Sequence, residues 1–278
     1  MTRRELGVVL EEAYGRLNVP ELIHPDPLEF VYRYDETADR EVAGLVAACL
    51  AYGRVPQILA SVARVLDPMG VSPAAFLSDC TERGLRRRFA GFKHRWTTSE
   101  ELVAFLLGVQ RARAAFGSLE GCFMAFHDRA SETTIDGLAG FVGFLRGDFG
   151  KNSLLASPKG GSACKRLHLY LRWMVRCDAV DPGCWRSVSP AALVVPLDTH
   201  MHRAGRALRL IRRKSPDLGA ALEMTRAFKA MSPEDPLRYD FALTRMGIRD
   251  DLDLKAFIQA CRAGHPTPVR AAIKGDAA

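Results

Sequence analysis

The stretch Val195-Pro196-Leu197-Asp198-Thr199-His200-Met201-His202-Arg203 contains the strongest local signal in this chain. An apolar run stops at Asp198, and a basic segment with helical character follows it. An Asp directly before a helix accepts hydrogen bonds from otherwise unpaired amides of the first turn, and the helix dipole favours negative charge there. Asp198 is therefore either a plain helix cap or a fixed carboxylate that stabilises positive charge developing on a bound sugar.

Helical periodicity continues over most of the chain. An apolar stripe at three- and four-residue spacing runs through 6–17, and the Ala-rich apolar run at 39–51 is typical of a buried helix. Further helices are expected at 54–66, 99–116, 118–129, 133–146, 163–177, 199–212, 216–230, 234–247 and 253–263. Alternating strand patterns are nearly absent apart from a short extended piece at 194–197. The sequence therefore predicts an all-α protein.

The bulk composition is that of a globular protein with a basic balance. The 278 residues include 39 Lys and Arg against 32 Asp and Glu, which gives a formal net charge of +7. That balance suits a polyanionic partner without establishing one. We find no signal peptide and no apolar run long enough for a membrane span, so no membrane partner is expected. The seven cysteines are scattered, which favours reduced thiols and a cytoplasmic location.

The segment around Asp198 resembles the catalytic aspartate segment of the helix-hairpin-helix DNA glycosylases, the endonuclease III superfamily. In that superfamily the Asp opens a helix and faces the scissile glycosidic bond. The resemblance implies a two-lobed helical fold with a central cleft, built as one domain over 1–263. The middle lobe would span roughly 54–195, and both chain ends would form the other lobe. Residues 264–278 carry two prolines and small residues and are expected to form a flexible tail.

A candidate nucleophile precedes Asp198. The resemblance places Lys165 near the catalytic lysine of these enzymes, with Lys159 in reserve. The interval from Lys165 to Asp198 is longer than in endonuclease III but similar to that of the archaeal 8-oxoguanine glycosylases. A bifunctional glycosylase needs an amine that attacks the sugar C1′, and a neighbouring cation such as Arg166 helps to populate the neutral amine. A lone Lys at such a position is otherwise an ordinary solvated side chain.

Several residues are candidates for contact with nucleic acid. The glycines near Lys159 let backbone amides approach a phosphate, although they are equally plain turn residues. The turn after the early apolar helix carries an aromatic and a guanidinium that suit a base or an opened duplex, where many relatives have Gln. The basic run after Asp198 can neutralise phosphates or form a solvated helix face. The candidates are Tyr52, Arg54, Lys159, Gly160, Gly161, Arg166, His200, His202, Arg203 and Arg206.

Longer stretches resemble a bacterial family known only as a domain of unknown function, over residues 20–250. The matching wording is SPKGGSACKRLHLYLRWMVR at 157–176, PLDTH at 196–200 and PEDPxRYDFALTRxGI at 233–248. The last stretch places Asp240 on a helix. Asp240 then faces the cleft, or it is a buried helix cap or forms an ion pair with Arg238 or Arg245.

These observations favour a DNA glycosylase, with or without abasic-site lyase activity, that acts on a damaged base, with an oxidised purine slightly favoured. The alternative is a non-catalytic nucleic-acid-binding module, and a helical protein with incidental basic faces is a weaker one. DNA is the expected partner, RNA remains open, and a monomer is expected. His200 and His202, or Cys164 and His168, have ligand-like spacing but lack a full zinc signature, and the cysteines do not match an iron–sulfur cluster. We therefore expect no metal, and the mechanism demands no cofactor.

Overall fold

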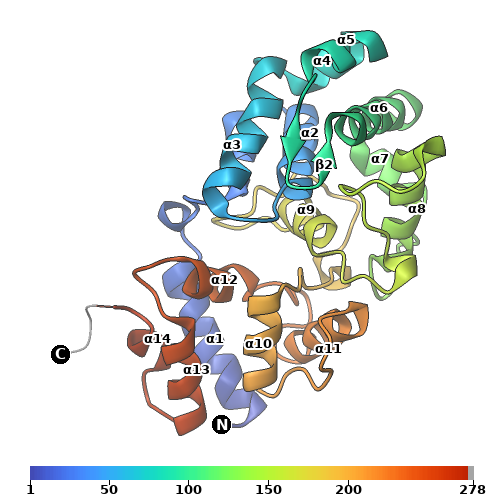
Figure 1. Ribbon diagram of the computed structural model, residues 1–278. Helices are drawn as coiled ribbons and strands as arrows, with labels where there is room; N and C mark the ends of the chain where they lie inside the picture. Colours follow the sequence, from blue (N-terminus) through green and yellow to red (C-terminus); the bar gives the residue numbers. More distant parts are fainter. Residues whose placement is uncertain (275–278) are drawn as a thin grey trace.

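The regular elements of the described residues are helices, apart from one small β-hairpin. A computed structural model describes residues 1–274 (Figure 1). The first half contains α1 (Arg3–Leu17), α2 (Thr37–Cys49), α3 (Val55–Leu66), α4 (Pro73–Asp79), α5 (Glu82–Arg88), β1 (Lys93–His94), β2 (Thr97–Thr98), α6 (Ser99–Phe116) and α7 (Leu119–Met124). The second half contains α8 (Ile135–Arg146), α9 (Lys165–Val175), α10 (Thr199–Ala207), α11 (Leu218–Lys229), α12 (Asp240–Ile248), α13 (Leu254–Ala263) and α14 (Pro268–Ala271). The predicted all-α class is confirmed.

Local capping chemistry sets many helix starts. Helix α6 begins with a capping box, in which Thr98 Oγ1 accepts from the Glu101 amide and Glu101 Oε2 accepts from the Thr98 amide. Its bounds match the predicted helix at 99–116. The side chains of Asp217 and Asp253 cap α11 and α13 in the simpler way. These starts were predictable because the capping groups lie within three residues of the amides they bind.

Other predicted bounds are wrong, for local reasons. The helix expected at 199–212 ends at Ala207, because Arg209 takes a left-handed conformation and the Leu210 amide turns back to the Gly205 carbonyl. The helix expected at 234–247 begins only at Asp240, after a turn that contains Pro236. Residues 194–197, predicted as a short extended piece, lie in a segment that is neither helix nor strand, and the two strands of the described residues pair as the β1–β2 hairpin.

Helix α2 forms the centre of the core. Its side chains from Val42 to Cys49 are at most 1% exposed, as expected from the Ala-rich sequence. It packs against α9 and against a 3₁₀ helix, η2 (Pro27–Arg33). Because small side chains allow close approach, α9 lies directly on α2, and this contact fixes the start of α9 relative to the turn after α2.

The two ends of the chain meet in the fold. Helix α1 packs against α12 and α14, and Figure 1 shows α1 and α10–α14 together in one half of the molecule, with α2–α8 in the other. Part of the expected tail at 264–278 is ordered here: α14 lies within it, and Val269 is fully buried. Residues 275–278 of that expected tail lie outside the described residues.

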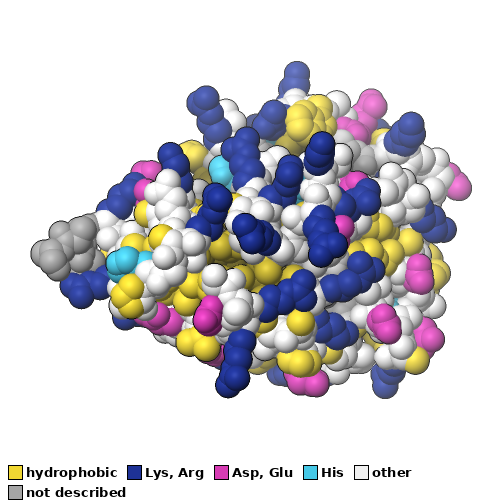
Figure 2. All heavy atoms as spheres, turned by 90° about the horizontal axis from the view of Figure 1, so that it is seen from below, with side chains coloured by type: hydrophobic (Ala, Val, Ile, Leu, Met, Phe, Trp, Pro, Cys, Tyr) yellow, Lys and Arg dark blue, Asp and Glu magenta, His cyan; other side chains and the backbone are white. Residues whose placement is uncertain are grey.

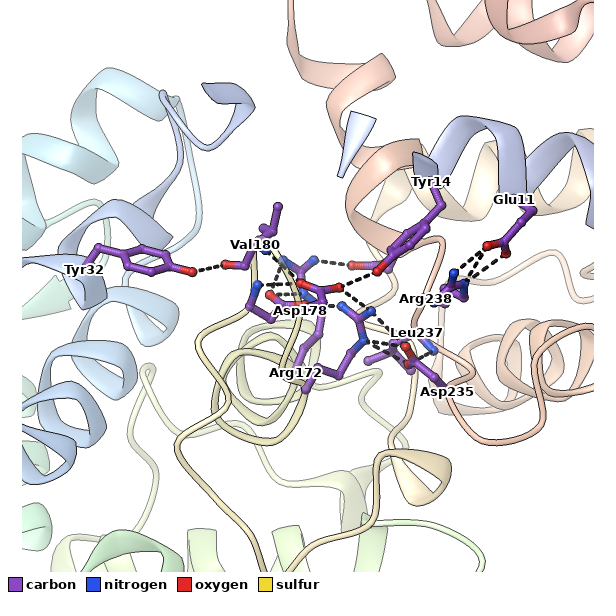
Figure 3. A network of polar contacts seen from close by, with 12 residues as sticks. Glu11, Tyr14, Tyr32, Arg172, Asp178, Val180, Asp235, Leu237 and Arg238 are labelled. Atoms are coloured by element: carbon purple, nitrogen blue, oxygen red, sulfur yellow. Dashed lines mark hydrogen bonds and ion pairs between the residues drawn. The ribbon is translucent and has the colours of Figure 1, made fainter. Parts of the chain in front are cut away.

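A buried ion network joins these distant segments (Figure 3). The Arg172 guanidinium donates to Asp181 Oδ1 at 3.0 Å and to Asp240 Oδ2 at 2.6 Å, and all three side chains are at most 3% exposed. Arg176 binds Asp181 and also Asp235, at 2.9 Å. At the edge of the network, Arg238 pairs with Glu11 of α1. Charges buried this deeply need partners, so the network fixes how α9 and α12 sit together.

Candidate active site

A cavity of about 790 Å³ lies where α9, α10, α12 and the turn after α2 meet. Both candidate catalytic residues, Lys165 and Asp198, line it. Much of the remaining wall is apolar, and its apolar lining includes Pro25, Pro27, Ile58, Leu169, Phe241 and Ile248. Cavities of this size hold ligands as large as a nucleoside.

Asp198 is the N-cap of α10, as the sequence predicted. Its Oδ1 accepts a hydrogen bond from the Met201 amide at 2.7 Å, while its backbone is extended. The apolar residues before it, Val195 and Leu197, are buried in the core and hold this end of the segment in place. Oδ1 is therefore held by the helix. The side chain is 26% exposed, and Oδ2 lies toward Lys165 at the cavity wall.

Lys165 is the first residue of α9. Cys164 before it takes a left-handed backbone conformation, with φ of 43°, which turns the chain sharply into the helix. The Lys165 Nζ lies 3.6 Å from Asp198 Oδ2, and its side chain is 35% exposed. The tertiary structure thus brings together an amine and a carboxylate that are far apart in the sequence. Such a pair can deliver a nucleophile and accept its proton.

Asp240 supplies a second carboxylate to the cavity wall. It pairs with Arg172, so the predicted partners are wrong: Arg238 binds Glu11, and Arg245 binds Asp26. Burial raises the pKa of Asp240, the Arg172 guanidinium opposes that rise, and the negative charge of Asp198 adds to it. Its Oδ1 has no hydrogen-bond partner in the protein. Asp240 is therefore a buried acceptor beside the Lys165–Asp198 pair, with one oxygen still unsatisfied.

Tyr52, Arg54 and Arg166 line the same cavity. The Arg166 guanidinium donates to the carbonyls of Cys49 and Ser153, and it lies 4.7 Å from the centre of the Tyr52 ring. These two hydrogen bonds tie the start of α9 to the end of α2 and to the loop at Ser153. Arg54 is exposed at the start of α3 and remains available for an anion.

Lys159, Gly160 and Gly161 lie outside this cavity lining. They form a short 3₁₀ helix, Pro158–Gly160, and a left-handed turn in which Gly161 has a φ of 75°. All three are exposed, and the Gly161 carbonyl accepts from the Leu218 amide of α11. The glycines act here as turn residues that lead the chain into α9. The exposed Lys159 side chain lies outside the site that contains Lys165.

The basic residues after Asp198 lie at the cavity, at the exposed surface and in the interior. His200 lines the cavity, and Arg203 and Arg206 are exposed on α10. Arg203 faces a second, open groove of about 640 Å³ between α10 and α13. His202 differs from the expectation: it is buried, and its Nε2 hydrogen-bonds to the Arg213 carbonyl at 3.0 Å. It therefore fastens the loop after α10, because helical periodicity turns it inward between exposed neighbours.

Basic side chains dominate one face of the molecule. Figure 2 shows Lys and Arg side chains spread over most of one face, with fewer acidic side chains between them.

Among residues 1–274, no group of three or more His, Cys, Asp or Glu side chains has the arrangement of a metal site. Within the same residues, no helix combines the length and apolar character of a membrane span.

The sequence matches one known protein family over most of its length. The family described as "Protein of unknown function (DUF2400)" matches residues 26–249. This range includes every residue of the cavity wall named above except Pro25. No curated protein and no solved structure matches the chain significantly.

Proposed function

We propose that this chain, which belongs to the DUF2400 family of proteins of unknown function, is a DNA glycosylase with abasic-site lyase activity. The observation that carries the proposal is the 3.6 Å approach of Lys165 Nζ to Asp198 Oδ2 at the wall of a nucleoside-sized cavity. The proposed fold is the two-lobed glycosylase type over residues 1–263, with 54–195 as the middle lobe and the cavity as its cleft.

The proposed reaction uses both groups. Asp198 accepts a proton from the Lys165 ammonium, and the neutral amine attacks C1′ of the damaged nucleotide. The C1′–N bond breaks, and the base leaves with the bonding electrons and takes up a proton. The sugar ring then opens: the C1′–O4′ bond breaks, O4′ takes up a proton, and the C1′–Lys165 nitrogen bond becomes a Schiff base. Loss of a C2′ proton to a base or water and β-elimination break the C3′–O bond, and the 3′ phosphate leaves with the bonding electrons. In the monofunctional alternative, Asp198 stays ionised and stabilises the oxocarbenium-like sugar while water replaces the base.

The cavity wall supports a flipped base as the occupant. Enzymes that act on a base in a duplex must extrude it into a pocket, where stacking and edge hydrogen bonds identify it. Phe241 provides an aromatic wall, and the exposed side chains of Thr199 and His200, which also line the cavity, can hydrogen-bond to base edges. Oxidised purines are slightly favoured, since 8-oxoguanine carries N–H donors at several edges.

The charge distribution supports DNA as the partner of a monomeric, cytoplasmic protein. The exposed Arg54, Arg203 and Arg206 lie around the cavity and on α10, where they can neutralise phosphates. The helices α9 and α10 both begin at the cavity, so their positive ends add to this attraction. Binding is therefore expected to weaken steeply with added salt.

Borohydride trapping tests the proposal. Duplexes with 8-oxoguanine, uracil, thymine glycol or an abasic site are incubated with the protein and borohydride, which reduces a Schiff base to a stable adduct. An adduct that disappears in Lys165→Ala supports a bifunctional enzyme. Base release without an adduct, but dependent on Asp198, indicates a monofunctional glycosylase.

A second candidate is a nucleic-acid-binding module without catalysis. The exposed arginines of α10 favour it, because they can bind phosphates whether or not Lys165 reacts. It predicts salt-dependent binding to DNA or RNA, with no adduct and no base release from any duplex in the panel.

A further inference from the structure

Four planar groups from distant segments lie next to one another beside the cavity. The Arg166 guanidinium lies 4.7 Å from the Tyr52 ring centre, and the Tyr52 and Trp96 rings stack with centroids 4.9 Å apart at 22°. The Arg95 guanidinium lies 4.7 Å from the Trp96 ring centre. We call Arg166, Tyr52, Trp96 and Arg95 the stacked column. It runs from the cavity wall, at Arg166 and Tyr52, to the exposed turn of the β1–β2 hairpin.

Hydrogen bonds hold the column in place. The Tyr52 hydroxyl is hydrogen-bonded to Thr97 Oγ1 and donates to the His94 carbonyl at 2.9 Å. The buried His94 ring in turn contacts Ser61 Oγ at 2.8 Å and the Tyr52 carbonyl at 3.0 Å. The hairpin is thus fastened to the turn after α2 on both sides of Trp96. The residues on either side of Trp96 are thereby fixed, so its ring already has a defined place on Tyr52 before a ligand binds.

The turn after α2 also makes room for Arg95. Gly53 has a φ of 108°, and a Cβ at this position would lie 3.1 Å from Arg95 Cδ. Arg95 itself has a left-handed backbone, with φ of 54°. An uncommon conformation at a large residue costs free energy that the fold must compensate. The geometry therefore directs Arg95 and Trp96 together to the end of the column.

Trp96 is exposed in a way that the other tryptophans are not. It is 57% exposed although it stacks on Tyr52, whereas Trp173 and Trp185 are at most 1% exposed. A large exposed aromatic ring beside arginines is the composition of a surface that binds unstacked bases. A single exposed apolar side chain is common at a protein surface. The arginines and the Tyr52 ring stacked beside Trp96 therefore carry the argument.

We propose that the outer end of the stacked column, the Arg95 guanidinium with the exposed part of the Trp96 ring beneath it, stacks on a nucleobase adjacent to the nucleotide that occupies the cavity. This inference rests on the proposed nucleic-acid function and names a contact outside the catalytic pair. The partner is an unstacked base in an opened duplex or a single strand, because a paired and stacked base offers no free face. Stacking does not read hydrogen-bond patterns, so the contact holds the strand open without selecting a sequence.

The test uses the fluorescence of Trp96. Because Trp173 and Trp185 are buried, acrylamide quenching in the free protein reports mainly on Trp96. The wild-type protein is titrated with a duplex carrying a tetrahydrofuran abasic analogue and with single-stranded oligothymidylate. Stacking is expected to quench the accessible emission and to protect the remainder from acrylamide. Trp96→Phe should bind with similar affinity but lack this signal.

The affinity of Trp96→Ala gives the second measurement. Loss of the stacked ring is expected to weaken binding of both probes roughly tenfold or more. Val71→Ala is the matched control, since Val71 is 96% exposed and belongs neither to the column nor to the cavity wall. Circular dichroism melts of all variants separate loss of contact from loss of fold.

The outcomes separate this inference from the proposed function. Binding without quenching, together with unchanged affinity in Trp96→Ala, overturns the stacking contact while DNA stays the partner. Quenching and affinity loss with neither a borohydride adduct nor base release from any duplex support the contact and remove the catalytic proposal. If the wild-type protein binds neither probe at low salt, both proposals fail.

Discussion

Lys165 Nζ lies 3.6 Å from Asp198 Oδ2, and the two residues stand at the starts of two different helices. Lys165 opens α9, which packs on the central helix α2, and Asp198 caps α10 after a buried apolar run. The positive ends of both helices therefore meet at the cavity. This arrangement attracts an anionic backbone and holds an amine and a carboxylate at the point where a sugar would lie.

Replacement of Lys165 tests the nucleophile. In Lys165→Ala the borohydride adduct on an abasic-site duplex is expected to fall roughly 100-fold or more, because Lys165 is the one lysine among the described residues that line the cavity. Lys159→Ala is the control: its exposed side chain lies outside the cavity lining, so trapping should persist. Equal trapping in the wild type and Lys165→Ala would remove Lys165 from the mechanism.

Two replacements of Asp198 separate its capping role from its chemical role. Asn is as good an N-cap as Asp, so Asp198→Asn should keep the hydrogen bond to Met201 and the free energy of unfolding within a few tenths of a kcal/mol. Base release should nevertheless slow roughly 10²- to 10³-fold. Asp198→Ala should additionally lose about 1 kcal/mol of stability. Single-turnover assays and urea titrations measure both effects, and unchanged release in Asp198→Asn would leave Asp198 a plain cap.

The buried His168 predicts a pH dependence of stability. It is 1% exposed, neither ring nitrogen has a hydrogen-bond partner, and burial lowers its pKa from 6.5 to about 4. A lowered folded-state pKa means that its contribution is complete above pH 6.5 and is lost as the pH falls toward 4. The expected loss is on the order of 3 kcal/mol over that window.

The His168→Leu variant isolates this effect. Leu cannot take up a proton, so the difference in unfolding free energy between variant and wild type should grow in the variant's favour from pH 6.5 to pH 4. Urea titrations at closely spaced pH values measure it. Parallel pH profiles for the two proteins would show that His168 takes no part.

The ion network predicts a large cost for a single replacement. Arg172→Met keeps most of the side-chain volume but leaves Asp181 and Asp240 without their shared partner, so a loss of about 3–5 kcal/mol is expected. Arg33→Met removes an exposed pair with Asp67 and should cost less than about 1 kcal/mol. Urea denaturation compares the two. A small effect of Arg172→Met would mean that water or relaxation compensates the carboxylates.

Much of the fold follows from the sequence. The helix at 99–116, the buried helix after residue 39 and the cap at Asp198 were all predictable. Each depends on groups three or four residues apart, so the chain needs no distant partner to specify them. Helix ends were less predictable: α10 stops early because the turn around Arg209 packs back on Gly205.

The roles of individual side chains depend on contacts that local patterns do not describe. His202 and Arg203 are neighbours in sequence, yet one is buried against the Arg213 carbonyl and the other is exposed. The place of Trp96 is likewise visible only in the tertiary structure, where its ring stacks on Tyr52. Helical spacing placed Asp240 inward, but only the packing of α9 on α12 determined that Arg172 would be its partner.

The sequence by itself therefore determined the helical class, most of the helices and the position of Asp198 at a helix start. The tertiary structure alone decided that Lys165 meets Asp198, that Asp240 joins their cavity and that Trp96 stands exposed beside it. The physical reason is the distance along the chain over which each interaction acts. Capping and periodicity act within one or two helical turns, whereas a site is assembled by the burial of helix faces that are distant in the chain.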